Sequence, residues 1–407
     1  TIGLAAARAN LAALATLTLA ASAPIPIQMT HEVRPYPVMI LVYGLAILAL
    51  LLTARRVADG GPLMSHAFVG YLAATALMLW LHSLGPLYGL ALGLAALLLV
   101  VRGSLTRTDW LWLIGGHLLV GLIYLPALLI LLDQAPTWIQ STWLGFETRD
   151  LWRRATAIYS GPRDDMRVAA LVLAIGAFAA GARSPLGRRV AVALLLLAIV
   201  PVLCSILISA TITPVFIVRT MTPLAVPAAI LFGVGAVGLA GWGQRIMLAA
   251  LIWMLIQQAA GAIATTRIRP MQDWYAALDW LAPRFRPGDI VYAYPNEGAL
   301  PFGRAVFDRG LAMPSRAIPT EIPSLNPPPG SWYVSGSRGV PSLDPAHLHA
   351  IAVEPRTRAV PTIWLLRLGP WAYDKGDVLL KELSAERIEV GRYRDGPIDI
   401  VGLRAKP

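Results

Sequence analysis

Residues 190–209 read VAVALLLLAIVPVLCSILIS and contain no charged side chain. A helix needs about 20 apolar residues to cross the hydrocarbon core of a bilayer, so this stretch by itself predicts a transmembrane helix. Other segments share its length and apolar character: 4–23, 37–54, 64–81, 84–101, 110–132, 167–182, 223–241 and 246–264. The sequence therefore predicts a polytopic α-helical membrane protein with about nine transmembrane helices.

The composition agrees with a membrane protein and also marks a boundary. Apolar residues make up 57% of the 407 residues and charged residues 14%, whereas a soluble domain has about 25% charged residues. From Ile268 onward the apolar runs disappear, and Pro and charged residues become frequent. We predict a transmembrane helical domain over 1–267 and a soluble α/β domain over 268–407.

The C-terminal third carries the patterns of a small α/β domain. Trp274, Leu278 and Leu281 recur at helical spacing. Runs typical of strands follow at 289–294, 332–335, 362–368, 387–393 and 398–403. The Pro-rich stretch 312–330 between them predicts a loop.

The arginines indicate how the helices are oriented. Basic residues near helix ends are retained in the cytoplasm. Alternate loops hold Arg55, Arg56, Arg102, Arg107, Arg183, Arg188, Arg189 and Arg245. The opposite loops, 24–36, 82–85, 133–166 and 210–222, then face outward, and so does the C-terminal domain. Because the net charge of +11 is spread along helix ends, we expect membrane lipids and no nucleic acid as partners.

One outward loop gathers polar groups. Residues 24–36 read PIPIQMTHEVRPY, and His31, Glu32, Arg34 and Tyr36 therefore meet at one membrane surface. Such groups are costly beside apolar helix unless they are paired or used. The segment is either an interfacial anchor, with Tyr36 in the aromatic belt and Arg34 reaching the headgroups, or a polar site. In a site, Arg34 would bind a phosphate and Glu32 would orient an acceptor or a metal.

A second outward segment, residues 213–223, reads TPVFIVRTMTP. Arg219 has apolar neighbours on both sides, so it either extends to the headgroups or meets a lipid phosphate. His82 lies at another outward turn, where a lone histidine is more often a hydrogen-bonded turn residue than a ligand. We predict that Glu32, Arg34 and Arg219 converge on one outward cavity, because a shared polar cavity lowers the cost of all three charges.

Other sequence features argue against a nucleotide site, an internal disulfide and a His/Cys metal site. Gly233-Val234-Gly235-Ala236-Val237-Gly238 matches a dinucleotide fingerprint, but no strand precedes it. We interpret it as close helix packing and expect no nucleotide cofactor. The single Cys204 excludes an internal disulfide, and no His/Cys metal cluster is present in the sequence. Residues 136–152 interleave aromatic and polar side chains, which predicts a helix in the outer interface.

Several short motifs together resemble a known family. They are Pro26-Ile27-Gln28 followed by Glu32-x-Arg34-x-Tyr36, the turn with His82, Tyr124-Leu125-Pro126, Pro214-Val215-Phe216-x-x-Arg219, and Pro287-Gly288-Asp289-Ile290-Val291. In this order they resemble the bacterial C-type (GT-C) integral-membrane glycosyltransferases related to protein mannosyltransferases. The resemblance implies a GT-C-like helical bundle in a bacterial inner (plasma) membrane, with the C-terminal domain in the periplasm.

The resemblance also implies an activity: transfer of a sugar, a hexose or a pentose, from a polyprenyl-phosphate carrier to a lipid, glycan or protein acceptor. Glu32 matches a catalytic acidic residue of the family, and Arg34 and Arg219 match positions that meet the lipid phosphate. His31, Tyr36 and His82 would line the substrate cavity. A divalent metal (Mg or Mn) would assist. Position 220 departs from the pattern, with Thr where the family often has an aromatic residue.

The family's main catalytic acidic residue lies in a first outer loop, which we expect upstream of Thr1. Two other classes of protein stay open. A transporter or flippase of a lipid-linked sugar would show inverted repeats with paired broken helices, and none is found in the sequence. A non-catalytic scaffold that displays the outer domain would leave the polar residues of 31–36 without a use.

Overall fold

The computed structural model describes residues 2–30, 34–101, 105–141, 145–161, 163–266, 272–318, 345–374 and 376–406. Contacts along the chain divide it into two compact units, Thr1–Leu131 with Leu144–Arg267, and Leu132–Trp143 with Ile268–Pro407. That the two units are separate domains stays a prediction.

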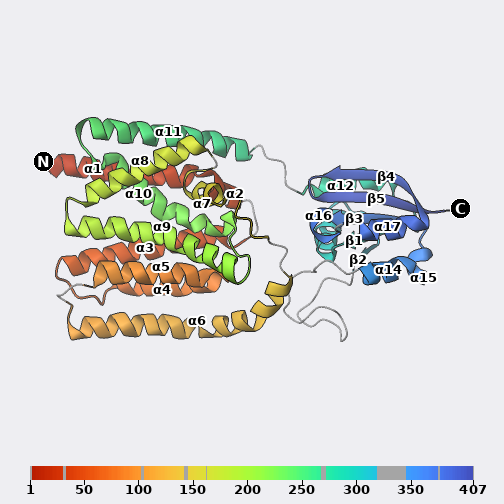
Figure 1. Ribbon diagram of the computed structural model, residues 1–407, viewed down its shortest axis with the longest axis horizontal. Coiled ribbons are helices and arrows are strands. Elements are labelled where there is room, and N and C mark those ends of the chain that lie inside the picture. The colour runs from red at the N-terminus through yellow and green to blue at the C-terminus, as the bar shows by residue number, and fades with distance from the viewer. Residues whose placement is uncertain are drawn as a thin grey trace. The chain divides into compact units, whose positions relative to one another are not determined.

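The first unit is a bundle of helices, and each of the nine predicted apolar segments is helical (Figure 1). Its elements are α1 (Ile2–Ser22), α2 (Pro24–Thr30), α3 (Tyr36–Ala58), α4 (His66–Leu81), α5 (Gly85–Val100), α6 (Arg107–Ser141), α7 (Leu151–Ser160), α8 (Asp164–Gly181), α9 (Pro185–Thr211), the 3-10 helix η1 (Val218–Leu224), α10 (Ala225–Gly238) and α11 (Gly241–Thr266). The end of α6, from Leu132 on, is grouped with the second unit.

Not all of these helices have the length and composition of a full membrane span. Within the described ranges, five are long and apolar enough: α3, α6, α9, η1 with α10, and α11. A sixth would be α1 with α2, which are bent by 53° at their junction. The helices α4 and α5 have only 16 residues each, and α8 carries Asp164, Asp165 and Arg167 in its first turn. The chain is a polytopic helical membrane protein, and the number of nine spans stays a prediction.

The helix α3 shows why the bundle belongs in lipid. Its inner face is buried and apolar, with Met39 and Ile47 fully covered. Its outer face is apolar too, because Leu41, Leu45, Leu48 and Leu52 are all about half exposed or more. A helix that is hydrophobic all round is stable only where its surroundings are apolar. Lipid therefore supplies the environment of the outer face.

Glycines let the helices of the bundle pack closely. A Cβ atom at Gly235 would lie 1.9 Å from the carbonyl oxygen of Leu173 in α8, and one at Gly233 would lie 2.7 Å from the carbonyl oxygen of Ala12 in α1. Only a residue without a side chain fits at such a distance. The interpretation of this glycine motif as helix packing is confirmed, and α10 lies against α1 and α8.

The prediction of an interfacial helix over 136–152 was wrong. Residues 136–141 continue α6, and 145–150 are not helical. A separate short helix, α7, begins only at Leu151, after Asp150 takes a left-handed backbone conformation with φ of 57°. Because an αL residue interrupts a right-handed helix, the two helices cannot join there. Trp152 at the start of α7 is 73% exposed, whereas Ile158 is buried.

The second unit is an α/β layer, as predicted. Its elements are α12 (Trp274–Leu281), the 3-10 helices η2 (Ala282–Arg284) and η3 (Asn296–Gly298), β1 (Ile290–Tyr294), α13 (Ala299–Asp308), β2 (Ser315–Ala317), α14 (Pro345–Val353), α15 (Pro355–Arg358), β3 (Thr362–Leu368), α16 (Pro370–Tyr373), α17 (Val378–Ala385), β4 (Arg387–Asp395) and β5 (Ile398–Ala405). The strand order is β2-β1-β3-β5-β4, with β1 parallel to β2 and β3, and β5 antiparallel to β3 and β4.

Both faces of this sheet are covered. Alternate residues of a strand point to opposite faces, so Trp364 and Leu366 of β3 join the core formed with α12 and α13, while Ile363 and Leu365 join the core formed with α14 and α17. Four of the predicted strands are confirmed, and the fifth, 332–335, lies outside the described residues. The short strand β2 falls within the predicted loop 312–330.

A group of charges is buried beside this sheet. Arg367 in β3 is 2% exposed and forms ion pairs with Asp374 at 3.0 Å, with Asp377 and with Asp399. Asp399 in β5 also accepts two hydrogen bonds from Arg392, both 2.9 Å long. The group ties β3, β4, β5 and the segment before α17 together.

Candidate functional site

The outward loops predicted at 24–36, 82–85 and 210–222 meet at one end of the bundle. The short helix η1, which carries Arg219, contacts α2, α3, α7, α9 and α10. Tyr88 of α5 also reaches it, because its hydroxyl donates a hydrogen bond of 2.5 Å to the carbonyl oxygen of Thr220. The helix η1 is therefore central to this end, which we call the η1 end of the bundle.

Tyr36 and His82 lie together at the η1 end. Their ring centroids are 5.9 Å apart. Tyr36 is only 3% exposed, so it is part of the core and not of an exposed aromatic belt. Nδ1 of His82 accepts a hydrogen bond of 3.1 Å from the backbone N–H of Leu84, which stabilises the turn between α4 and α5. His82 thus has the turn role expected of it and also adjoins the candidate site.

Arg219 is half-buried in η1, and its Nε atom is buried without a hydrogen-bond partner among the described residues. No carboxylate in the described part of the chain lies within ion-pair distance of it. A buried donor without a partner costs about 1–3 kcal/mol. An Arg that only reached the headgroups would keep its guanidinium in water, so this position favours a bound anionic group.

The backbone that carries Arg219 is held firmly. The hydroxyl of Tyr88 binds the carbonyl oxygen of Thr220, the residue after Arg219. The ring of Tyr88 packs edge-on against Tyr43, with ring centroids 5.1 Å apart. On the other side, Oγ of Ser209 accepts the backbone N–H groups of Val215 at 2.9 Å and Phe216 at 2.8 Å. These contacts fix both sides of the segment, which favours a preorganised guanidinium.

The other residues predicted for the site are either exposed or outside the described part of the chain. Arg34 is exposed just before α3, two positions from Tyr36, and α3 contacts η1. His31 and Glu32 lie outside the described residues. The structure thus brings Tyr36, His82 and the segment of Arg219 to one end of the bundle, while the convergence of Glu32, Arg34 and Arg219 stays a prediction.

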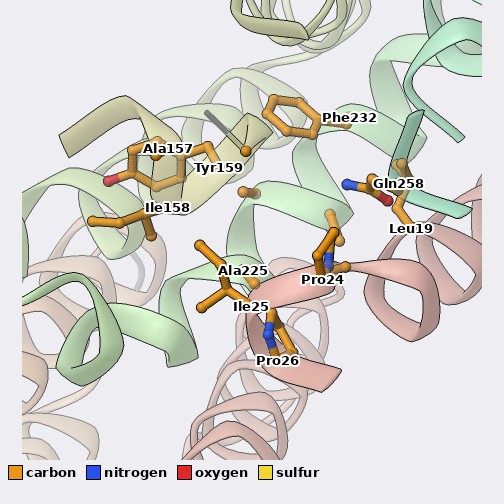
Figure 2. Close-up of a pocket in the computed structure, with 14 residues that line it drawn as sticks. Leu19, Pro24, Ile25, Pro26, Ala157, Ile158, Tyr159, Ala225, Phe232 and Gln258 are labelled. Atoms are coloured by element: carbon orange, nitrogen blue, oxygen red, sulfur yellow. The ribbon is translucent and has the colours of Figure 1, made fainter. Parts of the chain in front are cut away.

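An apolar cavity of about 60 Å³ lies beside this end (Figure 2). Its lining comes mainly from α1, α2, α7, α10 and α11. Figure 2 labels Leu19, Pro24, Ile25, Pro26, Ala157, Ile158, Tyr159, Ala225, Phe232 and Gln258 among the lining residues. The one side-chain amide in the lining, that of Gln258, accepts a hydrogen bond of 2.9 Å from Ser22. The cavity therefore offers apolar contact and no group suited to chemistry on a sugar.

The described residues hold no group of three or more His, Cys, Asp and Glu side chains that could bind a metal ion. Glu32 lies outside the described residues, so the divalent metal that the resemblance implies stays a prediction and no chemical step is assigned to one.

Sequence reasoning missed Tyr88 and Ser209, which position the site. Each lies inside an apolar helix, and a buried hydroxyl must find a hydrogen-bond partner. This requirement could have marked both residues as positions that need a hydrogen-bond partner, but it does not identify the partner.

Comparisons with known proteins add little. No family model matches the chain, and no curated protein matches its sequence. A solved structure, the single-particle cryo-EM structure of the arabinofuranosyltransferase AftD from mycobacteria, is similar to it with a TM-score of 0.46 and 14% sequence identity. The match covers 97% of this chain and 31% of the length of that one. A likeness of this degree establishes neither family nor activity.

Proposed function

We propose that this chain is a membrane glycosyltransferase that moves a sugar from a polyprenyl-phosphate carrier to a lipid, glycan or protein acceptor at the outer face of a bacterial inner membrane. Under this proposal the η1 end of the bundle and the second unit face the periplasm. The sugar is a hexose or a pentose, and no nucleotide cofactor takes part.

The observation that carries the proposal is the state of Arg219. Its guanidinium is half-buried at the end of an apolar bundle, on a segment held by Tyr88 and Ser209, and its Nε lacks a partner among the described residues. A phosphate with an apolar tail suits such a place, because guanidinium groups form strong charge-assisted hydrogen bonds to phosphate and the bundle surface is apolar.

The proposed reaction is a substitution at the anomeric carbon of the sugar. The acceptor hydroxyl forms a bond to that carbon, the bond from the carbon to the phosphate oxygen breaks, and polyprenyl phosphate leaves. Glu32 takes the hydroxyl proton as general base. Arg219 and Arg34 stabilise the negative charge that grows on the leaving phosphate. Tyr36 and His82 line the space for the sugar.

The test uses the full chain in proteoliposomes, with radiolabelled polyprenyl-phosphate hexoses and pentoses as donors and a membrane extract as the source of acceptors. We expect label to move from at least one donor to an acceptor. Arg219→Ala should raise KM for the donor about 10-fold to 100-fold, since a hydrogen bond to a charged group contributes about 1.5–3 kcal/mol. Glu32→Gln should lower kcat, because the amide keeps the shape and loses the charge.

Arg55→Ala is the matched control, because Arg55 has a side chain 80% exposed at the end of α3 remote from Tyr36. It should leave both constants unchanged. Movement of intact lipid-linked sugar across the vesicle membrane without transfer would favour the flippase class instead. A KM that responds equally to Arg55→Ala and Arg219→Ala would contradict the role given to Arg219.

A further inference from the structure

The second unit contains a cavity remote in sequence from all the residues of the η1 end. Its volume is about 290 Å³, and it is lined by residues of α14, α15, α17 and the start of β4. Small-molecule sites usually start at about 300 Å³, so this cavity has room for one compact ligand. Its lining is charged, with His349, Arg358, Glu382, Glu386 and Arg387.

Arg387 is the deepest of these charges. It is 6% exposed at the start of β4. Its guanidinium donates hydrogen bonds to the carbonyl oxygens of Thr357 at 2.6 Å and Leu403 at 3.3 Å, and it has no ion pair with a carboxylate of the described residues. Burial lowers the pKa of this guanidinium, yet an Arg side chain stays charged in proteins. A buried positive charge therefore lines the cavity without a direct ion pair. The nearby carboxylate of Glu386 acts on this charge but is itself bound to Arg358.

The other polar side chains at the rim are paired with one another. Arg358 donates two hydrogen bonds to the carboxylate of Glu386, at 3.0 and 2.8 Å, and Nδ1 of His349 lies 2.7 Å from Oε2 of Glu382. Lys406 adds a further cation nearby, since its Nζ donates to the carbonyl oxygen of Ala385, which lines the cavity. With Lys406 included, the cations Arg358, Arg387 and Lys406 outnumber the carboxylates of Glu382 and Glu386 by one. The exposed Arg358 can turn toward a ligand.

We propose that this cavity binds a small organic anion, in which a carboxylate or phosphate group meets Arg387 and Arg358 and neighbouring hydroxyl groups meet Glu382 and His349. The site is independent of the glycosyl transfer proposed above. A buried, prepositioned guanidinium selects an anion because such a ligand supplies a counter-charge in direct contact, which no carboxylate of the described residues gives it.

The test titrates the full chain in detergent with inorganic phosphate, glucuronate and glucose, and measures binding by calorimetry. We expect phosphate or glucuronate to bind and neutral glucose to bind at least about tenfold more weakly. Saturation by phosphate alone would assign a phosphate-bearing ligand, and saturation by glucuronate alone a carboxylate. Arg387→Gln should weaken the anion about tenfold or more.

Substitutions of the charged residues at the edge of the cavity test the proposal even if Arg387→Gln fails to fold. Arg358→Gln removes a cation and should weaken anion binding, whereas Glu386→Gln removes the competing carboxylate and should strengthen it. Arg356→Gln is the matched control, because Arg356 belongs to the same short helix, is 68% exposed and does not line the cavity. Binding of glucose as tight as that of the anions, no anion binding at millimolar concentration, or equal affinities in Arg358→Gln and Glu386→Gln would overturn the proposal. None of these results depends on transfer activity.

Discussion

Replacing Arg367 by Met should destabilise the second unit strongly. The side chain is buried and is the ion-pair partner of three carboxylates. After its removal Asp399 keeps two hydrogen bonds from Arg392, and Asp377 is 52% exposed to water. Among the described residues, the fully buried side chain of Asp374 keeps only the hydrogen bond from the backbone N–H of Leu379, at 3.0 Å. Removing one partner of a buried ion pair costs about 3–5 kcal/mol. Because one uncompensated carboxylate remains, we expect about 3 kcal/mol.

Hydrogen exchange of the full chain in detergent, followed by mass spectrometry over 398–405 at increasing urea, measures the free energy of unfolding of this sheet. The double variant Arg367→Met with Asp374→Asn should recover at least half of the loss, since the amide removes the uncompensated charge. Arg304→Met breaks a surface pair whose Arg is 71% exposed, and should cost less than about 1 kcal/mol. A loss below about 1 kcal/mol in Arg367→Met, or no recovery in the double variant, would refute the reasoning.

Three further predictions concern packing, pH and topology. Gly235→Ala should lower the free energy of unfolding by about 3 kcal/mol, the upper end for overpacking, because the new methyl group would overlap a carbonyl oxygen of α8. Thermal unfolding in detergent measures this loss. Gly93→Ala is the control, because a Cβ atom at Gly93 would have nothing within 4 Å. The hydrogen bond from Arg367 lowers the pKa of Asp377 from its ordinary 3.8. This carboxylate therefore stabilises the fold above about pH 4, and the stabilisation is lost as the pH falls through the lowered pKa. The urea midpoint of the second unit, measured at pH 7, 5 and 3, should fall only at pH 3, and it should fall less in Arg367→Met than in the unchanged protein. A reporter active only in the periplasm should work when fused after Pro407, whereas activity of a cytoplasmic reporter there would reverse the orientation.

Hydrophobic patterns predicted most of the fold. Every apolar segment became a helix, because a long uncharged run has no other way to satisfy its backbone in lipid. The strand over 362–368 was also found at its observed bounds, since its apolar, β-rich run stands between turns. Elements with weaker patterns were missed. The strand β2 has only three residues, and it forms because β1 offers an open edge, which is a property of the assembled sheet.

The candidate site was predictable only in part. Local sequence identified His82, Tyr36 and Arg219 as polar positions at helix ends, and the structure brings Tyr36 and His82 together. Local sequence could not pair Tyr88 with Thr220 or Arg367 with Asp399, because these contacts join residues 132 and 32 positions apart. Long-range pairing depends on how helices and strands are packed, which residue type alone does not specify.

The shortness of α4 and α5 has a consequence for the surrounding bilayer. A helix of 16 residues is about 24 Å long, whereas the hydrocarbon core is about 30 Å thick. Where lipid borders this helical hairpin, the two lengths disagree by about 6 Å, and a bilayer relieves such hydrophobic mismatch by thinning locally. Thinning draws the polar headgroups toward the turn at His82. The hairpin would then lower the membrane surface toward the Tyr36–His82 pair, and the behaviour of this end of the bundle should change with the acyl-chain length of the lipid around it.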